Sequence, residues 1–229
     1  MKLSIVVPVY NEERRISSNL SEIISYMNKK RLNHEIIIVN DGSTDNTLGI
    51  LHKFNKKVKI ISYEQNKGKG YAVKTGVLAA KGDRIFMCDA DLAMPIAELD
   101  KFLKEKEDIV IGSRSLKGSE VKTTLFKKIM GRIGNLLISA LIIRGIKDTQ
   151  CGFKLFDKKC KRIFEKQTIN RWGFDFEILF LARKFHYKIK EIPIKWTNMV
   201  GSKVELTDYP KTLFELLKIR FNDITGVYR

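Results

Sequence analysis

The chain has 229 residues, 44% hydrophobic and 30% charged, which are the proportions of one folded domain with a sizeable core. It contains no stretch of about 18 apolar residues, so no membrane-spanning helix is predicted. Lysine and arginine outnumber aspartate and glutamate by 43 to 26, giving a formal net charge of +17. This excess favours an anionic partner, such as a nucleic acid, an anionic membrane or a phosphorylated substrate. The alternative is that the protein is lysine-rich because its genome is AT-rich, without any such partner.

The first half of the sequence alternates short β-branched runs with amphipathic stretches. We predict strands at residues 3–9, 35–39, 58–63, 84–88 and 109–112. Helices are predicted at 12–30, 44–54, 70–80 and 96–104, the second capped by Ser43 or Thr44. This alternation predicts an α/β fold with right-handed crossovers and a mostly parallel sheet. The polar segments after the strands then lie at one sheet edge, where such folds bind ligands.

The second half is less regular. Residues 125–143 and the residues after Pro210 are predicted amphipathic helices, and residues 188–196 a strand. In the last helix, Leu213, Phe214, Leu217 and Phe221 share one side, with Lys211, Lys218 and Arg220 around them. No linker or repeat divides the chain. We therefore expect one unit, with residues 1–208 as the main domain and residues 209–229 as a helix that belongs to it.

The cysteine and histidine positions argue against a disulfide framework and against a zinc site. Cys88, Cys151 and Cys160 are odd in number and irregularly spaced, which argues against a disulfide framework and for a reducing compartment. The three scattered histidines give no Cys/His zinc spacing. The N-terminal segment lacks the length and cleavage site of a signal peptide. These features predict a cytoplasmic protein.

Residues 87–95 read MCDADLAMP and place Asp89 and Asp91 directly after a predicted buried strand. Two neighbouring carboxylates repel each other, and one takes up a proton unless a cation lies beside them. Oxygen ligands without histidine or cysteine suit Mg²⁺ or Mn²⁺, which completes its shell with substrate phosphates. The motif alone is weak, because a surface Asp-x-Asp without a role is common.

Further acidic residues follow the first two strands. Glu12 and Asp41 are expected at the same edge, where carboxylates can accept hydrogen bonds from a nucleobase or a ribose. A Walker-type loop is absent. Residues 66–76, NKGKGYAVKTG, resemble a glycine fingerprint, but they lack the third glycine at the required offset and follow the third strand rather than the first. Dinucleotide binding is therefore disfavoured.

Eight segments between residues 3 and 205 carry a resemblance to a known family. They are SIVVPVYNEE, IIIVNDGSTDNT, NKGKGYAVKTGVLAAKGD, DADL, GSR, DTQCGFKLF, RWGFDFEIL and EIPIKWTNMVGSK, in that order. Together they resemble the family 2 glycosyltransferases of GT-A fold. Within that family they are similar to the polyprenyl-phosphate branch, which includes dolichyl-phosphate glucosyltransferases and mannose synthases. The resemblance implies a GT-A domain over residues 1–208.

The resemblance also implies roles for individual residues. The pocket for the nucleotide sugar would be lined by Pro8, Tyr10, Glu12, Val39, Asp41, Asp89, Ala90 and Asp91. Asp91 would ligate Mg²⁺ or Mn²⁺ directly, and Asp89 would contact the ribose or the waters of the metal. Phosphate charge would be met by Arg114 and Lys203. The sugar and acceptor pocket would include Gln150, Arg132 and Trp172.

Ala93 bears on the donor. Mannose synthases of this type usually carry glutamine two positions after the second aspartate, whereas the glucosyltransferase branch carries alanine, as here. The resemblance therefore implies UDP-glucose as donor, with GDP-mannose as the alternative. Transfer to a polyprenyl monophosphate by single displacement would invert the anomeric centre and give a β-linked product. Asp175 and Glu177, in RWGFDFEIL, are candidate bases, and positioning an arginine or capping a loop is the favoured alternative for either.

The expected partners are a nucleotide sugar, a polyprenyl phosphate lipid and a membrane surface. The two late amphipathic helices have the pattern of interfacial helices, which predicts a peripheral protein on the cytoplasmic face of a membrane. Packing of these helices on the sheet, or in an oligomer interface, is the alternative. Transfer to a sugar hydroxyl and nucleotidyl transfer stay open as rival chemistries. Nucleic-acid binding is disfavoured, because the aromatic residues fall mainly at apolar periodic positions.

Overall fold

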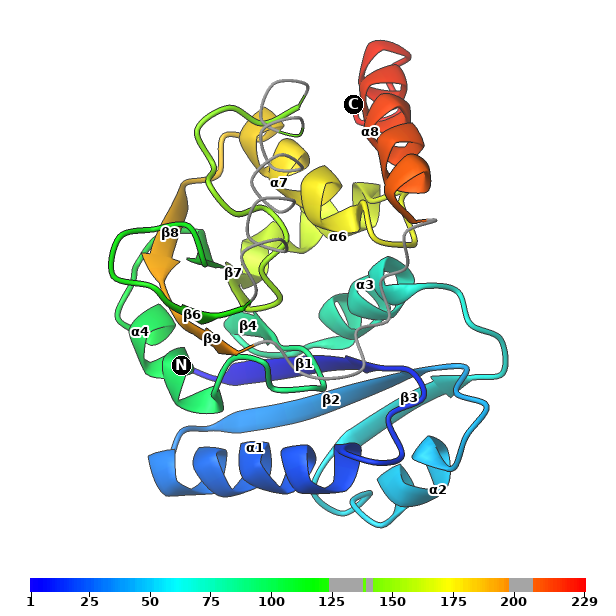
Figure 1. Cartoon of the computed structure of the whole chain (residues 1–229), viewed down its shortest axis with the longest axis vertical. Helices are drawn as coiled ribbons and strands as arrows, with labels where there is room; N and C mark the ends of the chain where they lie inside the picture. The colour runs from blue at the N-terminus through cyan, green and yellow to red at the C-terminus, as the bar shows by residue number, and fades with distance from the viewer. Residues whose placement is uncertain (124–137, 139–141, 198–207) are drawn as a thin grey trace.

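The computed structural model describes residues 1–123, 138, 142–197 and 208–229. Among these residues, a seven-stranded sheet has the order β3-β2-β1-β4-β7-β5-β8 (Figure 1). Its strands are β1 (Leu3–Val9), β2 (His34–Asp41), β3 (Lys59–Tyr63), β4 (Arg84–Met87), β5 (Ile109–Ser113), β7 (Lys154–Asp157) and β8 (Ile189–Pro193). Strand β7 runs antiparallel to β4 and β5, and the other pairings are parallel. The prediction of a mostly parallel α/β sheet is confirmed.

Helices cover both faces of this sheet, as Figure 1 shows. One face packs on α1 (Ile16–Lys30), α2 (Thr47–His52), the 3₁₀ turn η1 (Ile96–Glu98) and α4 (Leu99–Leu103). The other face packs on α3 (Lys69–Ala79), α6 (Lys161–Lys166) and α7 (Phe174–Lys184), with the 3₁₀ turn η2 (Lys158–Cys160) preceding α6. Helix α8 (Asp208–Ile224) packs against α7 and adds Leu216 and Ile219 to the same apolar core. Each face has its own apolar core, and together they fix the strand ends that carry the polar segments.

Two sequence predictions differ from the structure. Helix α2 begins only at Thr47, after Asn46, and Asn46 makes no side-chain cap. Ser43 and Thr44, predicted as caps, instead bind Asn11: Ser43 Oγ accepts the Asn11 amide at 2.9 Å. The predicted strand 188–196 is two strands, because β9 (Lys195–Thr197) leaves the main sheet and pairs with β6 (Glu120–Lys122).

The predicted helix at 125–143 lies outside the described residues, apart from Ile138, Ile142 and Ile143. The C-terminal helix is confirmed as α8. Its Leu216 and Ile219 are buried in the core, whereas the side carrying Phe214, Leu217 and Phe221 is exposed. In the part of the chain that the structure describes, no helix combines the length and apolar character needed to cross a bilayer.

All three cysteines are buried and not disulfide-bonded, as the sequence predicted. Cys88 directly follows β4, and Cys88 and Cys151 belong to the same apolar core.

Candidate active site

The Asp89–Asp91 turn follows β4 at the carboxyl edge of the sheet. The Cys88 amide donates to Val6 O at 3.0 Å, so β1 holds the start of the turn. Leu92 has φ 48°, an uncommon conformation for a residue with a Cβ, and such backbone costs about 1–2 kcal/mol. The Ala93 amide donates to Asp91 Oδ1 at 3.0 Å and fixes that carboxylate. Strained backbone held in place by its neighbours is typical of functional sites.

Asp89 lies in a basic environment. Lys69 Nζ is 2.6 Å from its Oδ1. A Cβ added to Gly152 would lie 1.8 Å from Asp89 Oδ2, so only glycine leaves room for this carboxylate. Burial raises the pKa of Asp89, but the charges of Lys69, Lys154 and Arg114 outweigh burial and lower it below the usual range. Asp89 is therefore held as an anion.

Asp91 differs from Asp89. Burial and then the charge of Asp89 raise its pKa above the usual range. A bound cation would relieve both effects, so the pair fits a divalent metal. Within the described residues no group of three His, Cys, Asp or Glu side chains gathers at one point. Two carboxylates suffice for Mg²⁺ or Mn²⁺ where substrate phosphates and water complete the coordination.

Asp41, at the end of β2, organises the loop before α3. It is buried and accepts the amides of Lys67 at 2.8 Å and Gly68 at 3.0 Å, together with Asn66 Nδ2 at 2.9 Å. Burial raises the pKa of Asp41 although these hydrogen bonds oppose it. Gly68 has φ 102°, which favours glycine. The NKGKG segment is thus a loop that wraps a carboxylate, consistent with the rejection of a dinucleotide fingerprint.

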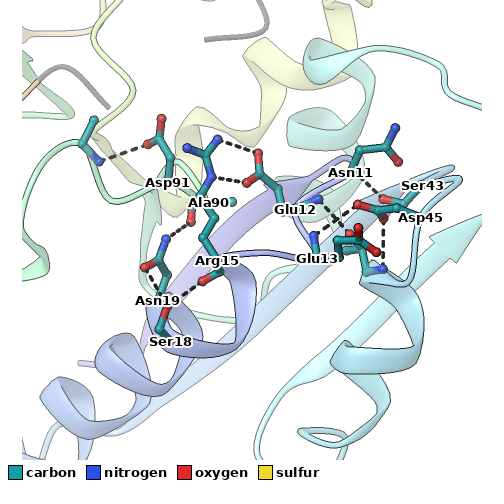
Figure 2. A network of polar contacts seen from close by, with 12 residues as sticks. Asn11, Glu12, Glu13, Arg15, Ser18, Asn19, Ser43, Asp45, Ala90 and Asp91 are labelled. Atoms are coloured by element: carbon teal, nitrogen blue, oxygen red, sulfur yellow. Dashed lines mark hydrogen bonds and ion pairs between the residues drawn. The ribbon is translucent and has the colours of Figure 1, made fainter. Parts of the chain in front are cut away.

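Glu12 lies on the loop after β1, and Figure 2 shows the Arg15 side chain between Glu12 and Asp91. Its carboxylate accepts both Nε and Nη2 of Arg15, the latter at 3.0 Å. The charge of Asp91 also acts on Arg15. Asn19 Nδ2 donates to Ala90 O at 2.8 Å and ties the Asp89–Asp91 turn to α1. Glu12 therefore positions a cation next to the predicted metal ligand.

Arg114, directly after β5, makes a bidentate ion pair with Asp148: its Nε and Nη2 donate to the carboxylate at 2.7 and 2.8 Å. The Arg114 guanidinium also lies 5.5 Å from the centre of the Trp196 ring. Asp148 in turn accepts the Arg114 backbone amide at 2.9 Å. A planar guanidinium held in this way is preorganised to present its remaining edge to a phosphate.

Asp175, one of the two candidate bases, lies at the start of α7 and binds Lys154. Lys154 Nζ donates to Asp175 Oδ1 and to Cys151 O, each at 2.5 Å. The Lys154 side chain is fully buried and that of Asp175 is 6% exposed. A carboxylate committed to a buried lysine favours the positioning alternative over a base. The pair joins α7 to β7 beneath Asp89.

The structure places the other predicted residues as follows. Pro8 and Val39 are paired neighbours on β1 and β2, and the fully buried Val39 can form only the floor of a pocket. Tyr10 and Trp172 are half-buried at the edge, Ala90 is buried in the turn, and Gln150 is exposed. Arg132 and Lys203 lie outside the described residues, so their roles stay predictions.

Sequence reasoning missed four charged residues of this site: Arg15, Lys69, Asp148 and Lys154. Lys69, Asp148 and Lys154 lie within the segments that resemble family 2 glycosyltransferases. The ion pairs of all four, apart from Arg15–Glu12, join residues 20 or more positions apart and no local pattern marks them. Lys154, the one basic residue in the otherwise apolar segment CGFKLF, could have been predicted to form a buried ion pair, because a lysine among buried residues requires a partner.

A parallel sheet whose edge carries an Asp-x-Asp turn surrounded by cations is the architecture of GT-A glycosyltransferases. The family described as Glycosyl transferase family 2 matches residues 4–164. The chain therefore belongs to glycosyl transferase family 2.

Curated relatives extend the likeness over nearly the whole chain. A dolichyl-phosphate beta-glucosyltransferase of Trichomonas vaginalis is 39% identical over 236 residues, covering 95% of this chain and 72% of that protein. The human enzyme of the same name is 35% identical over 251 residues, covering 100% and 78%. The Saccharomyces cerevisiae enzyme is 36% identical over 255 residues, covering 99% and 76%.

Solved structures agree on the fold. Mannosyl-3-phosphoglycerate synthase from Rubrobacter xylanophilus superposes with a TM-score of 0.68 at 16% identity, covering 99% of this chain and 75% of that one. Glucosyl-3-phosphoglycerate synthase from Mycobacterium tuberculosis, in complex with Mn²⁺, UDP-glucose and phosphoglyceric acid, gives 0.66 at 17% identity, covering 95% and 79%. At this identity the likeness shows the fold alone, and it confirms the predicted GT-A class.

Proposed function

We propose that this protein transfers glucose from UDP-glucose to dolichyl phosphate or another polyprenyl monophosphate, with inversion, giving a β-linked lipid-phosphate sugar. The observation that carries this proposal is the near full-length similarity to dolichyl-phosphate beta-glucosyltransferases. Ala93 supports the donor, because a buried methyl group stands where a mannose synthase would usually offer another ligand.

Asp91, with Asp89 beside it, would hold Mg²⁺ or Mn²⁺. When bound, the metal supplies positive charge to the diphosphate that leaves the sugar. Arg15 and Arg114 flank this position, and we assign Arg114 to the phosphate charge of donor or acceptor. A phosphate monoester has a second pKa of about 6, so the acceptor is already an anionic nucleophile at neutral pH. Asp175 forms a buried ion pair with Lys154 and is therefore not placed as a base, which agrees with a reaction that needs no strong base.

We further propose that α8 docks the enzyme on an anionic membrane. One stripe of apolar side chains is exposed by 48 to 79%. On α8 it consists of Phe214, Leu217, Phe221 and Ile224, and Val227 follows the helix. The exposed Lys211, Lys218 and Arg220 flank the stripe, and apolar side chains bordered by basic ones fit an anionic lipid surface. Docking there would bring the enzyme to the lipid that carries its acceptor.

A donor panel tests the reaction. Purified protein is given UDP-glucose, UDP-galactose, UDP-GlcNAc or GDP-mannose with polyprenyl phosphate and Mn²⁺, and the lipid product is quantified. UDP-glucose should be the preferred donor, and Asp91→Ala should abolish transfer without loss of thermal stability. Preference for GDP-mannose, transfer to a sugar hydroxyl in place of lipid phosphate, or an active Asp91→Ala variant would each overturn part of the proposal.

Point substitutions in α8 test the membrane surface better than truncation, because Ile219 and Tyr228 belong to the core. Leu217→Ser/Phe221→Ser should lower co-sedimentation with phosphatidylserine vesicles. Leu78→Ser is the control, since Leu78 is an exposed apolar residue on α3. If vesicle binding is unchanged and the wild type elutes as a dimer that the double variant dissociates, the stripe is a subunit interface instead.

A further inference from the structure

Lys69 is a cation of the site to which neither the family likeness nor the proposed reaction assigns a role. It is the first residue of α3, and its ammonium lies 2.6 Å from Asp89 Oδ1. The same ammonium lies 5.7 Å from the centre of the Trp172 ring. The Lys69 side chain is 23% exposed, so it reaches the edge of the site without being sealed inside it.

The backbone is held by hydrogen bonds on both sides of Lys69. Asp41 accepts the amides of Lys67 and Gly68, as described above. The Tyr71 amide donates to Asn170 O at 3.0 Å, and a Cβ at Gly68 would lie 2.4 Å from that oxygen. The position of the Lys69 Cα is therefore set by the carboxyl end of β2 and by the loop before α7, and only the flexible side chain can change partner.

The partner of Lys69 is one of the two carboxylates proposed to serve the metal. An ammonium and a divalent cation repel each other, so they compete for Asp89 Oδ1. A nucleoside diphosphate bound at the same turn would offer the ammonium new anionic oxygens within reach of a lysine side chain. Asp91, which accepts the Ala93 amide, does not make this ion pair with Lys69.

We infer that Lys69 exchanges partners during donor binding. In the donor-free enzyme its ammonium neutralises Asp89. With a nucleoside diphosphate and a divalent cation bound, Asp89 would serve the metal and its waters, and the Lys69 ammonium would donate to a diphosphate oxygen instead. Lys69 is thus a donor-binding residue that also keeps Asp89 compensated in the empty site. This inference rests on the proposed function, since it requires a metal and a nucleotide diphosphate at the Asp89–Asp91 turn.

Two opposite changes in the Lys69→Met variant test the exchange. Mn²⁺ binding to nucleotide-free protein, followed by electron paramagnetic resonance, should tighten because the competing ammonium is gone. UDP binding at saturating Mn²⁺, followed by calorimetry, should weaken about tenfold, the effect of losing one charge-assisted hydrogen bond. Lys69→Arg should retain most of the UDP affinity. Lys30→Met is the matched control, because Lys30 makes a 2.5 Å ion pair with Asp100 at the surface and carries the same charge.

The outcomes distinguish failure of the Lys69 role from failure of the proposed function. Wild-type protein that binds neither Mn²⁺ nor UDP would overturn the proposed function and the role of Lys69 with it. Wild-type protein that binds both, while Lys69→Met behaves like Lys30→Met, would overturn the role of Lys69 alone. Weaker Mn²⁺ binding in Lys69→Met would also contradict the exchange, because it would mean that Lys69 supports the metal site. Lys69→Arg decides the case if Lys69→Met does not fold.

Discussion

The buried pair Lys154–Asp175 gives the sharpest stability prediction. Both side chains are almost fully buried and their charged atoms are 2.5 Å apart. Lys154→Met keeps the length and apolar stem of the side chain but leaves Asp175 in the interior without its cation. Removing one member of a buried pair costs about 3–5 kcal/mol, whereas an exposed pair such as Lys30–Asp100 is worth about 0–1 kcal/mol.

Urea and thermal unfolding at pH 7 measure this cost. In a protein of this size 1 kcal/mol shifts Tm by about 2–4 °C, so Lys154→Met should lower Tm by roughly 10 °C. The double variant Lys154→Met/Asp175→Leu should recover most of the loss, since it removes both charges. A loss below about 1 kcal/mol in the single variant, or a double variant no more stable than the single one, would refute the reasoning.

The stability lost in Lys154→Met should depend on pH, and its direction follows from the pKa of Asp175. Burial already raises the pKa of Asp175 in the wild type, and Lys154 is the largest influence that lowers it. Without Lys154 the folded-state pKa rises further above the unfolded value. A carboxyl with a raised folded pKa loses stability as the pH rises through that pKa. Lys154→Met should therefore lie closer to the wild type at pH 5 than at pH 8.

Three further predictions follow from single contacts. Gly152→Ala should cut transfer about 100-fold, measured by initial rates, because its Cβ would displace the Asp89 carboxylate. An unchanged rate would show that Asp89 can move without cost. Glu177→Gln should lose about 2 kcal/mol in urea unfolding, because the buried carboxylate accepts the Ile169 amide, the Thr168 amide and hydroxyl, and Tyr228 OH. Unchanged stability would mean that the amide satisfies the same donors. Arg114 holds the pKa of Asp148 below its usual range although burial opposes it. Without Arg114, burial would raise the pKa of Asp148, so the stability advantage of the wild type over Arg114→Met should shrink as the pH falls. A difference that grows in acid would contradict this assignment.

The first five strands and the Asp89–Asp91 turn were predictable because their signals lie in neighbouring residues of the sequence. Strand β1 was predicted with its observed bounds, because a short run of β-branched residues is typical of a buried strand. The antiparallel β7 was missed, because its four residues carry no periodic signal and its position between β4 and β5 depends on pairing across the sheet. The start of α2 was predicted wrongly for a similar reason: Ser43 and Thr44 form hydrogen bonds with Asn11, which is distant in the sequence.

The ion pairs also explain how a chain with a net charge of +17 keeps an acidic turn. Glu12 is matched by Arg15, Asp89 by Lys69, Asp148 by Arg114 and Asp175 by Lys154. Asp91 stands apart, because its carboxylate accepts a neutral amide and its pKa is raised. A divalent cation therefore gains most at Asp91, the one carboxylate of these five without a cation pairing in the described structure. Removal of the metal and Asp91→Ala should then have the same effect on transfer, and residual metal-dependent activity in Asp91→Ala would place the metal on Asp89 instead.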